Sequence, residues 1–122
     1  MRPQAATGTD DDEDHCMTFR WPGDVEGSYG YRGNSGKKWT SSKWESYGHS
    51  FDKAGDVVGC GVIDDACFFT KNGELLGVAF RGVQRGLYPT VGLGYGDTVE
   101  GNFGQKVFTF DLDWERMRQQ CF

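Results

Sequence analysis

The sequence predicts an all-β fold, an antiparallel β-sandwich, and three observations support this prediction. Glycine accounts for 19 of 122 residues and Phe, Trp and Tyr for 15%, whereas glycine is usually about 7% of a protein. Short apolar segments recur between clusters of Gly, Asn, Asp and Ser, a spacing typical of sandwiches. The length suits a single domain with one core.

Residues 1–20 are polar and acidic and have no apolar period, so we expect a disordered acidic tail there. The folded domain is predicted over 21–112, and 113–122 is expected to be a short C-terminal tail that could form a helix. The predicted strands, in chain order, are 28–33, 37–41, 56–63, 66–71, 74–80, 87–94 and 97–103.

Two turn sequences predict a strand register. Asn72-Gly73 suits a two-residue type I′ turn, which would place Phe69 opposite Leu76 and Cys67 opposite Val78. An equally short turn at 64–65 would place Val62 opposite Cys67 and Cys60 opposite Phe69. One face of the sheet is then apolar and is predicted to be core. Its residues are Val58, Cys60, Val62, Cys67, Phe69, Leu76, Val78 and Phe80. The opposite face carries small residues, Gly59, Gly61, Ala66, Gly77 and Ala79, around Phe68.

Charge and hydropathy exclude several classes of function. Most of the net charge of −5 comes from the five acidic residues at 10–14, and the acidic pI of about 4.9 disfavours nucleic acid as a partner. Neither a long apolar run nor the apolar core of a signal peptide occurs. We therefore expect a protein of the cytoplasm, the nucleus or both, with reduced cysteines and no membrane partner.

No pattern of residues indicates catalysis. His15 and His49 have no evident partner, and no nucleophile motif or Cys-X-X-Cys spacing is present. The glycine-rich run 92–96 precedes a predicted strand rather than a helix, so it does not form a phosphate loop. The sequence therefore predicts no enzyme activity, no metal site and no cofactor.

Residues 27–53 interleave cations with aromatic rings. Arg32, Lys37, Lys38, Lys43 and Lys53 alternate with Tyr29, Tyr31, Trp39, Trp44 and Tyr47. Such a mixture favours recognition of a peptide through stacking and charge-assisted hydrogen bonds. The same composition is compatible with single-stranded nucleic acid, or with a simple aromatic core and solvated lysines.

Four runs in order, GDVVGCGV, FFTKNGELLGVAF, LYPTVGL and NFGQKVFTFDL, resemble the SPRY domain. Together with SYGYRGNSGKKW, they are most similar to the SPRY domain of the Ran-binding protein M family, over about 22–112. The resemblance implies a concanavalin-type jelly roll without catalytic residues. It also implies a protein-interaction module of a scaffold or ubiquitin-ligase adaptor, with a CTLH-type ubiquitin ligase as a partner. Strands of the family's N-terminal side are not found before Trp21, so we expect an incomplete domain.

The resemblance also suggests where a partner peptide binds. In peptide-binding relatives the partner contacts loops at one end of the sandwich. Gly94, Tyr95 and Gly96 match a Val-Trp-Gly stretch there, and Arg32, after Tyr31, matches a basic residue. Lys37 and Trp39 extend the cluster. The predicted partner-binding residues are Tyr31, Arg32, Lys37, Trp39, Gly94, Tyr95 and Gly96. The alternatives are a carbohydrate-binding sandwich that stacks sugars on Trp39, Trp44 and Tyr95, or a non-functional truncated gene product.

Overall fold

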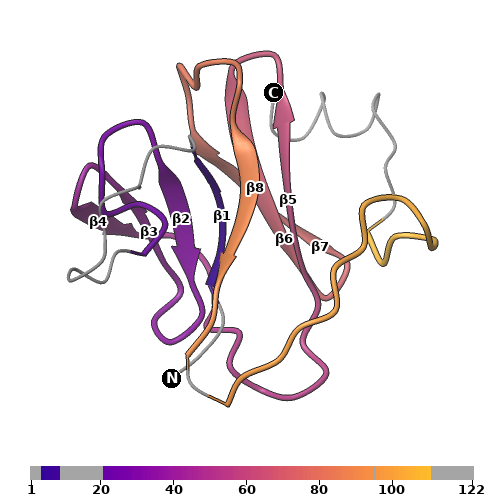
Figure 1. Ribbon diagram of the computed structural model, residues 1–122. Helices are drawn as coiled ribbons and strands as arrows, with labels where there is room; N and C mark the ends of the chain where they lie inside the picture. The colour runs from indigo at the N-terminus through magenta and orange to yellow at the C-terminus, as the bar shows by residue number, and fades with distance from the viewer. Residues whose placement is uncertain (1–3, 9–20, 95, 111–122) are drawn as a thin grey trace.

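The protein is a sandwich of two antiparallel β-sheets (Figure 1), which confirms the predicted fold class. The computed structural model describes residues 4–8, 21–94 and 96–110. One sheet has the strand order β4-β3-β2-β1-β8 and the other the order β5-β6-β7. The strands are β1 (Gln4–Gly8), β2 (Tyr29–Arg32), β3 (Lys37–Thr40), β4 (Lys43–Ser46), β5 (Val58–Ile63), β6 (Ala66–Lys71), β7 (Glu74–Phe80) and β8 (Tyr88–Gly92). In the part of the chain described, no helix has the length and apolar character needed to cross a bilayer.

Strand β1 lies inside the five-stranded sheet, between β2 and β8. The disordered tail predicted for 1–20 is therefore wrong at Gln4–Gly8. This segment has no apolar pattern of its own, but a position between two strands satisfies its backbone hydrogen-bonding groups on both sides. Residues 9–20 and the predicted tail at 113–122 lie outside the described residues.

Two further strand predictions need correction. The predicted strand at 37–41 is the first half of a hairpin, because Ser41 and Ser42 turn with φ of 50° and 63° and β4 follows. Positive φ at both residues is the geometry of a type I′ turn, which usually contains Asn or Gly. The strand predicted at 97–103 is wrong. The amide of Asp97 donates to the Gly94 carbonyl and its carboxylate accepts from the Gly94 amide, so the chain bends after β8.

In the three-stranded sheet the register between β5 and β6 is confirmed, with Cys60 opposite Phe69 and Val62 opposite Cys67. Between β6 and β7 the pairs next to the turn agree with a two-residue turn. The register then shifts at two places, between Thr70 and Phe68 and between Phe68 and Cys67. Cys67 therefore faces Phe80, and the predicted pair of Cys67 with Val78 is wrong. Gly77 has a φ of 97° in this stretch, and a glycine with positive φ accommodates the extra residue of a β-bulge.

The main core lies between the two sheets, and its buried residues are Tyr31, Phe51, Cys67, Phe69, Ala79 and Val83. Ala79 therefore belongs to the core rather than to the opposite face, because the bulge displaces the end of β7. Cys60 and Val62 were predicted in the core but are exposed, since β5 is an edge strand. A second, smaller cluster of Ile63 and Phe68, with Leu75 and Phe110 against it, covers the outer face of this sheet.

Candidate functional site

A basic and aromatic surface lies on the outer face of the five-stranded sheet. Arg32 ends β2, and its guanidinium carbon lies 3.8 Å from the centre of the Trp39 ring on β3. The same guanidinium donates a hydrogen bond to the carboxylate of Asp24, and only 15% of the Arg32 side chain is exposed. Stacking and the ion pair thus hold Arg32 in one position and leave little of its charge available to a partner.

Lys37 and Trp44 form a second cation and ring pair beside the first. Trp39 and Trp44 are directly opposite each other on β3 and β4, so both rings lie on one face. The Lys37 ammonium lies 3.5 Å from the centre of the Trp44 ring, and Trp44 is 50% exposed. Trp44 is absent from the predicted partner contacts because the Ser-Ser sequence gives no strong turn signal. The apolar residue between polar ones in KWES was the available clue.

The chain before β2 crosses this outer face. A Cβ at Gly30 would lie 2.2 Å from the carbonyl oxygen of Pro22, and one at Gly92 would lie 2.5 Å from the Trp21 ring. Both contacts are far closer than a side chain allows. Glycines in β2 and β8 therefore admit segment 21–24, which ends at the aspartate that holds Arg32.

Tyr31 is in the core and has no exposed surface. Its hydroxyl donates to the carbonyl of His49, and its ring contacts Tyr47, Phe51 and Phe69. Burial, and then the negative charge of Asp56, raise the pKa of Tyr31 to about 12. The prediction of Tyr31 as a partner contact is wrong in this structure, because a fully buried side chain cannot touch a docked peptide.

The loop after β8 lies at the same end of the sandwich as Arg32. Gln4 pairs with Arg32 on one side and with Gly92 on the other, so the strand ends are in register (Figure 1). Gly94 is buried, Gly96 is exposed with a φ of 85°, and Tyr95 lies outside the described residues. The structure thus brings the predicted Arg32, Lys37, Gly94 and Gly96 to one end, with Trp39 on the adjoining outer face. Their role in binding stays a prediction.

Hydrogen bonds between neighbouring loops make this end well defined. The amide of Gly48 donates to the Gly36 carbonyl at 2.9 Å, and the amide of Phe51 donates to the Gly33 carbonyl at 2.9 Å. Close by, the Asn72 side chain accepts from the amide of Val57. A scaffold of this kind holds binding residues in place without ordering them at the moment of binding.

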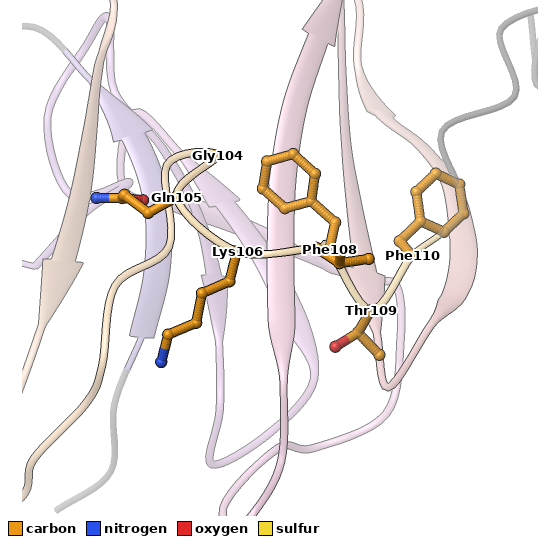
Figure 2. Close-up of a pocket in the computed structure, with 7 residues that line it drawn as sticks. Gly104, Gln105, Lys106, Phe108, Thr109 and Phe110 are labelled. Carbon is orange, nitrogen blue, oxygen red and sulfur yellow. The ribbon is translucent and has the colours of Figure 1, made fainter.

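A hollow elsewhere on the molecule is lined by residues 104–110 (Figure 2). All of its lining comes from one stretch of chain, and Figure 2 shows the rings of Phe108 and Phe110 over the three-stranded sheet. Its charged residue, Lys106, is paired with Glu100 at 2.7 Å. Among the described residues, no three His, Cys, Asp or Glu side chains are grouped as a metal site would require. The hollow therefore offers neither an acid and base pair nor metal ligands.

Fold and surface together define a β-sandwich that presents an aromatic and basic face beside end loops. The family profile named SPRY domain matches residues 11–106, so the chain belongs to the SPRY domain family. The match begins before Trp21, where the domain was predicted to start.

The family assignment is supported by individual relatives. Ran-binding protein 9 of Xenopus tropicalis is 49% identical over 98 residues, which cover 77% of this chain and 18% of that protein. The Ran-binding proteins 9/10 homolog of Drosophila melanogaster is 46% identical over 104 residues, 82% of this chain and 11% of that protein. A crystal structure of a human SPRY domain matches with a TM-score of 0.61 and 25% identity, over 75% of this chain and 60% of that one. The chain thus spans less than a fifth of these two curated relatives.

Proposed function

We propose that this chain is a non-enzymatic protein-interaction module that binds a short peptide segment of a partner through loops at one end of the sandwich. Membership of the SPRY family and similarity to Ran-binding proteins support the general role. The loop contacts are Lys37, Tyr95 and Gly96, and Gly94, which is buried and bonded to Asp97 through its amide and its carbonyl, holds the loop in place. Arg32 and Trp39 form the base of this surface. The ion pair with Asp24 and the stacking on Trp39 hold Arg32 in place.

The observation that carries the proposal is the register of β1 with its two neighbours. Because Gln4 faces both Arg32 and Gly92, two segments about sixty residues apart in sequence converge on one end of the sheet. A peptide that spans this end would meet the Lys37 charge and the backbone of the glycine loop together. Cations beside aromatic rings and accessible backbone groups are typical of peptide-binding surfaces.

The same geometry argues against the carbohydrate alternative. Sugars stack on open faces of aromatic rings, but Arg32 lies over the Trp39 ring and Lys37 over the Trp44 ring. A sugar that stacked on the ring face covered by either cation would have to displace that cation. A carboxylate-bearing peptide could instead approach the Lys37 ammonium where it lies.

We extend the proposal to the cellular role. Similarity to Ran-binding proteins 9 and 10 supports a module of a scaffold or ubiquitin-ligase adaptor, with a CTLH-type ubiquitin ligase as partner, in the cytoplasm or the nucleus. The support for these assignments is relatedness to the two proteins, of which this chain spans a small part.

The test is affinity capture of the full 122-residue chain from cells, followed by quantitative mass spectrometry. Lys37→Glu and Tyr95→Ala are expected to reduce recovery of ligase subunits at least about fivefold, a loss of about 1 kcal/mol. Arg85→Glu is the matched control, since Arg85 is exposed in the loop after β7, at the other end of the sandwich. If both end-loop variants are folded and retain every partner, the proposed surface is wrong.

A further inference from the structure

Among the residues that the structure describes, strand β4 is an open edge of the five-stranded sheet. It is the outermost strand in the sheet order, and all four of its residues, Lys43–Ser46, are exposed. No proline or bulge interrupts its pairing with β3. An exposed edge of this kind can accept a further strand.

The hairpin geometry determines which backbone groups of β4 face outward. In a two-residue hairpin the residues flanking the turn, here Thr40 and Lys43, form a hydrogen-bonded pair. Alternation then makes Trp39 and Trp44 a non-hydrogen-bonded pair. Trp44 and Ser46 therefore direct their N–H and C=O groups away from β3, toward the open edge.

The charges around this edge are predominantly positive. The β3–β4 hairpin carries Lys37, Lys38 and Lys43 against one acidic residue, Glu45. Lys38 points inward and donates to the carbonyl of Ala79 at 2.8 Å. Lys37 belongs to β3, but its ammonium lies over the Trp44 ring and so brings its charge to β4. An added strand would meet two lysine charges, the single carboxylate of Glu45 and the half-exposed face of Trp44.

We infer that β4 binds an extended, acidic segment of a partner protein as an additional antiparallel or parallel strand. Backbone groups of Trp44 and Ser46 would bond the segment. Carboxylates on one face of the segment would pair with Lys37, which lies on the face of Trp44, and carboxylates on its other face would pair with Lys43. A second copy of β4 suits this edge less well than an acidic segment, because its single carboxylate, Glu45, can pair with Lys43 but leaves Lys37 without a carboxylate.

The inference deepens the proposed function by naming the chemistry of a partner, and it can fail independently. The proposed function depends on end loops and on Tyr95, whereas strand addition depends on the backbone of Ser46. Lys37 is shared by both surfaces, so it does not discriminate between them and is not used as the deciding variant.

The experiment uses the full chain and a synthetic eight-residue peptide in which pairs of glutamates alternate with pairs of valines, so that both faces of the strand carry carboxylates. Binding is followed by amide NMR and tryptophan fluorescence. We expect saturable binding, with the largest shifts at the amides of Trp44 and Ser46. Ser46→Pro removes one outward N–H at an edge position that tolerates proline, and should weaken binding about tenfold. Lys43→Glu should weaken it similarly, whereas Arg85→Glu should leave it unchanged.

A peptide that carries N-methyl groups on alternate amides tests the backbone bonds without altering the protein. If the peptide adds to β4 as a strand, N-methyl groups on the amides that face β4 should abolish binding. Equal binding of the methylated and unmethylated peptides would overturn the inference, as would equal binding of a lysine and valine peptide. Dimerisation of the chain that is lost in Ser46→Pro would show that the occupant is a second copy and would also overturn it.

Discussion

Substitution of Tyr31 tests whether this residue has a structural role or a binding role. Tyr31 was predicted to contact a partner but lies fully buried. Tyr31→Ala removes a ring whose centre lies 4.7 Å from that of Phe51 and 5.3 Å from that of Phe69. Truncation of a buried aromatic residue to alanine costs about 3–5 kcal/mol. Tyr31→Phe retains the ring contacts and loses only the hydrogen bond to His49, at a cost of about 1 kcal/mol.

The measurement is equilibrium unfolding in urea, followed by tryptophan fluorescence, for the wild type and both variants. Since domains of this size are stable by about 5–15 kcal/mol, Tyr31→Ala should lower the free energy of unfolding by a large share of the total. A loss below about 1 kcal/mol for Tyr31→Ala would contradict the core assignment. If Tyr31→Phe unfolded like the wild type but lost its partner, the hydroxyl would be a contact after all.

The dependence on pH supplies a second readout. The pKa of Tyr31 is raised to about 12 in the folded protein, against about 10 for an unfolded tyrosine. The folded state therefore favours the protonated hydroxyl. The contribution is fully present below pH 10 and is lost as the pH rises through 12. Tyr31→Phe should lack this component of the alkaline loss of stability.

Three further predictions each concern a single residue and its surroundings. Gly30→Ala should destabilise the domain by at least about 2 kcal/mol, measured by urea unfolding, because its Cβ would collide with the Pro22 carbonyl. Asn72→Ala should raise the pKa of Asp56 in an NMR titration, because the Asn72 side chain is the first cause of its lowered pKa. Val107→Lys should reduce aggregation in light scattering and change stability by less than about 0.5 kcal/mol, because Val107 is 95% exposed.

Each of these has a matched control. Gly55→Ala meets nothing within 4 Å, so it reports only the cost of a positive φ, which Gly30 does not have. An unchanged stability of Gly30→Ala would refute the collision. Asn72→Asp keeps the turn preference but replaces the donor, and it too should raise the pKa of Asp56. Thr109→Lys alters the same segment, and an equal effect on aggregation would show that charge rather than Val107 is responsible.

The hairpins illustrate what could be predicted from sequence. Asp64 and Asn72 adopt φ of 55° and 49°, and the pairs next to both turns are those expected of two-residue turns. This prediction succeeds because turn conformation is set by a few adjacent residues. The register beyond Gly77 was not predictable in the same way, since the position of a bulge depends on how Phe80 and Ala79 pack against the core.

The residues of the candidate site divide in the same way, into those that could be predicted from sequence and those whose position depends on packing. The aromatic and basic cluster predicts Lys37 and Trp39 as contacts, whereas Arg32 and the loop at 94–96 are predicted from family resemblance. The inward direction of Tyr31 could not be predicted, because the choice of face depends on the opposing sheet. Trp44 was named in the aromatic cluster and in the carbohydrate alternative but not among the partner contacts, and its strand was missed because it follows an unusual Ser-Ser turn.

Residue patterns along the chain were sufficient to specify short antiparallel strands, their turns and membership of the SPRY family, since these depend on neighbours in sequence and on ordered motifs. Packing decided that Gln4–Gly8 joins β2 to β8, that Asp24 restrains Arg32 and that β4 presents an open edge. These features arise from contacts between segments remote in sequence, where backbone pairing and burial outweigh local preference.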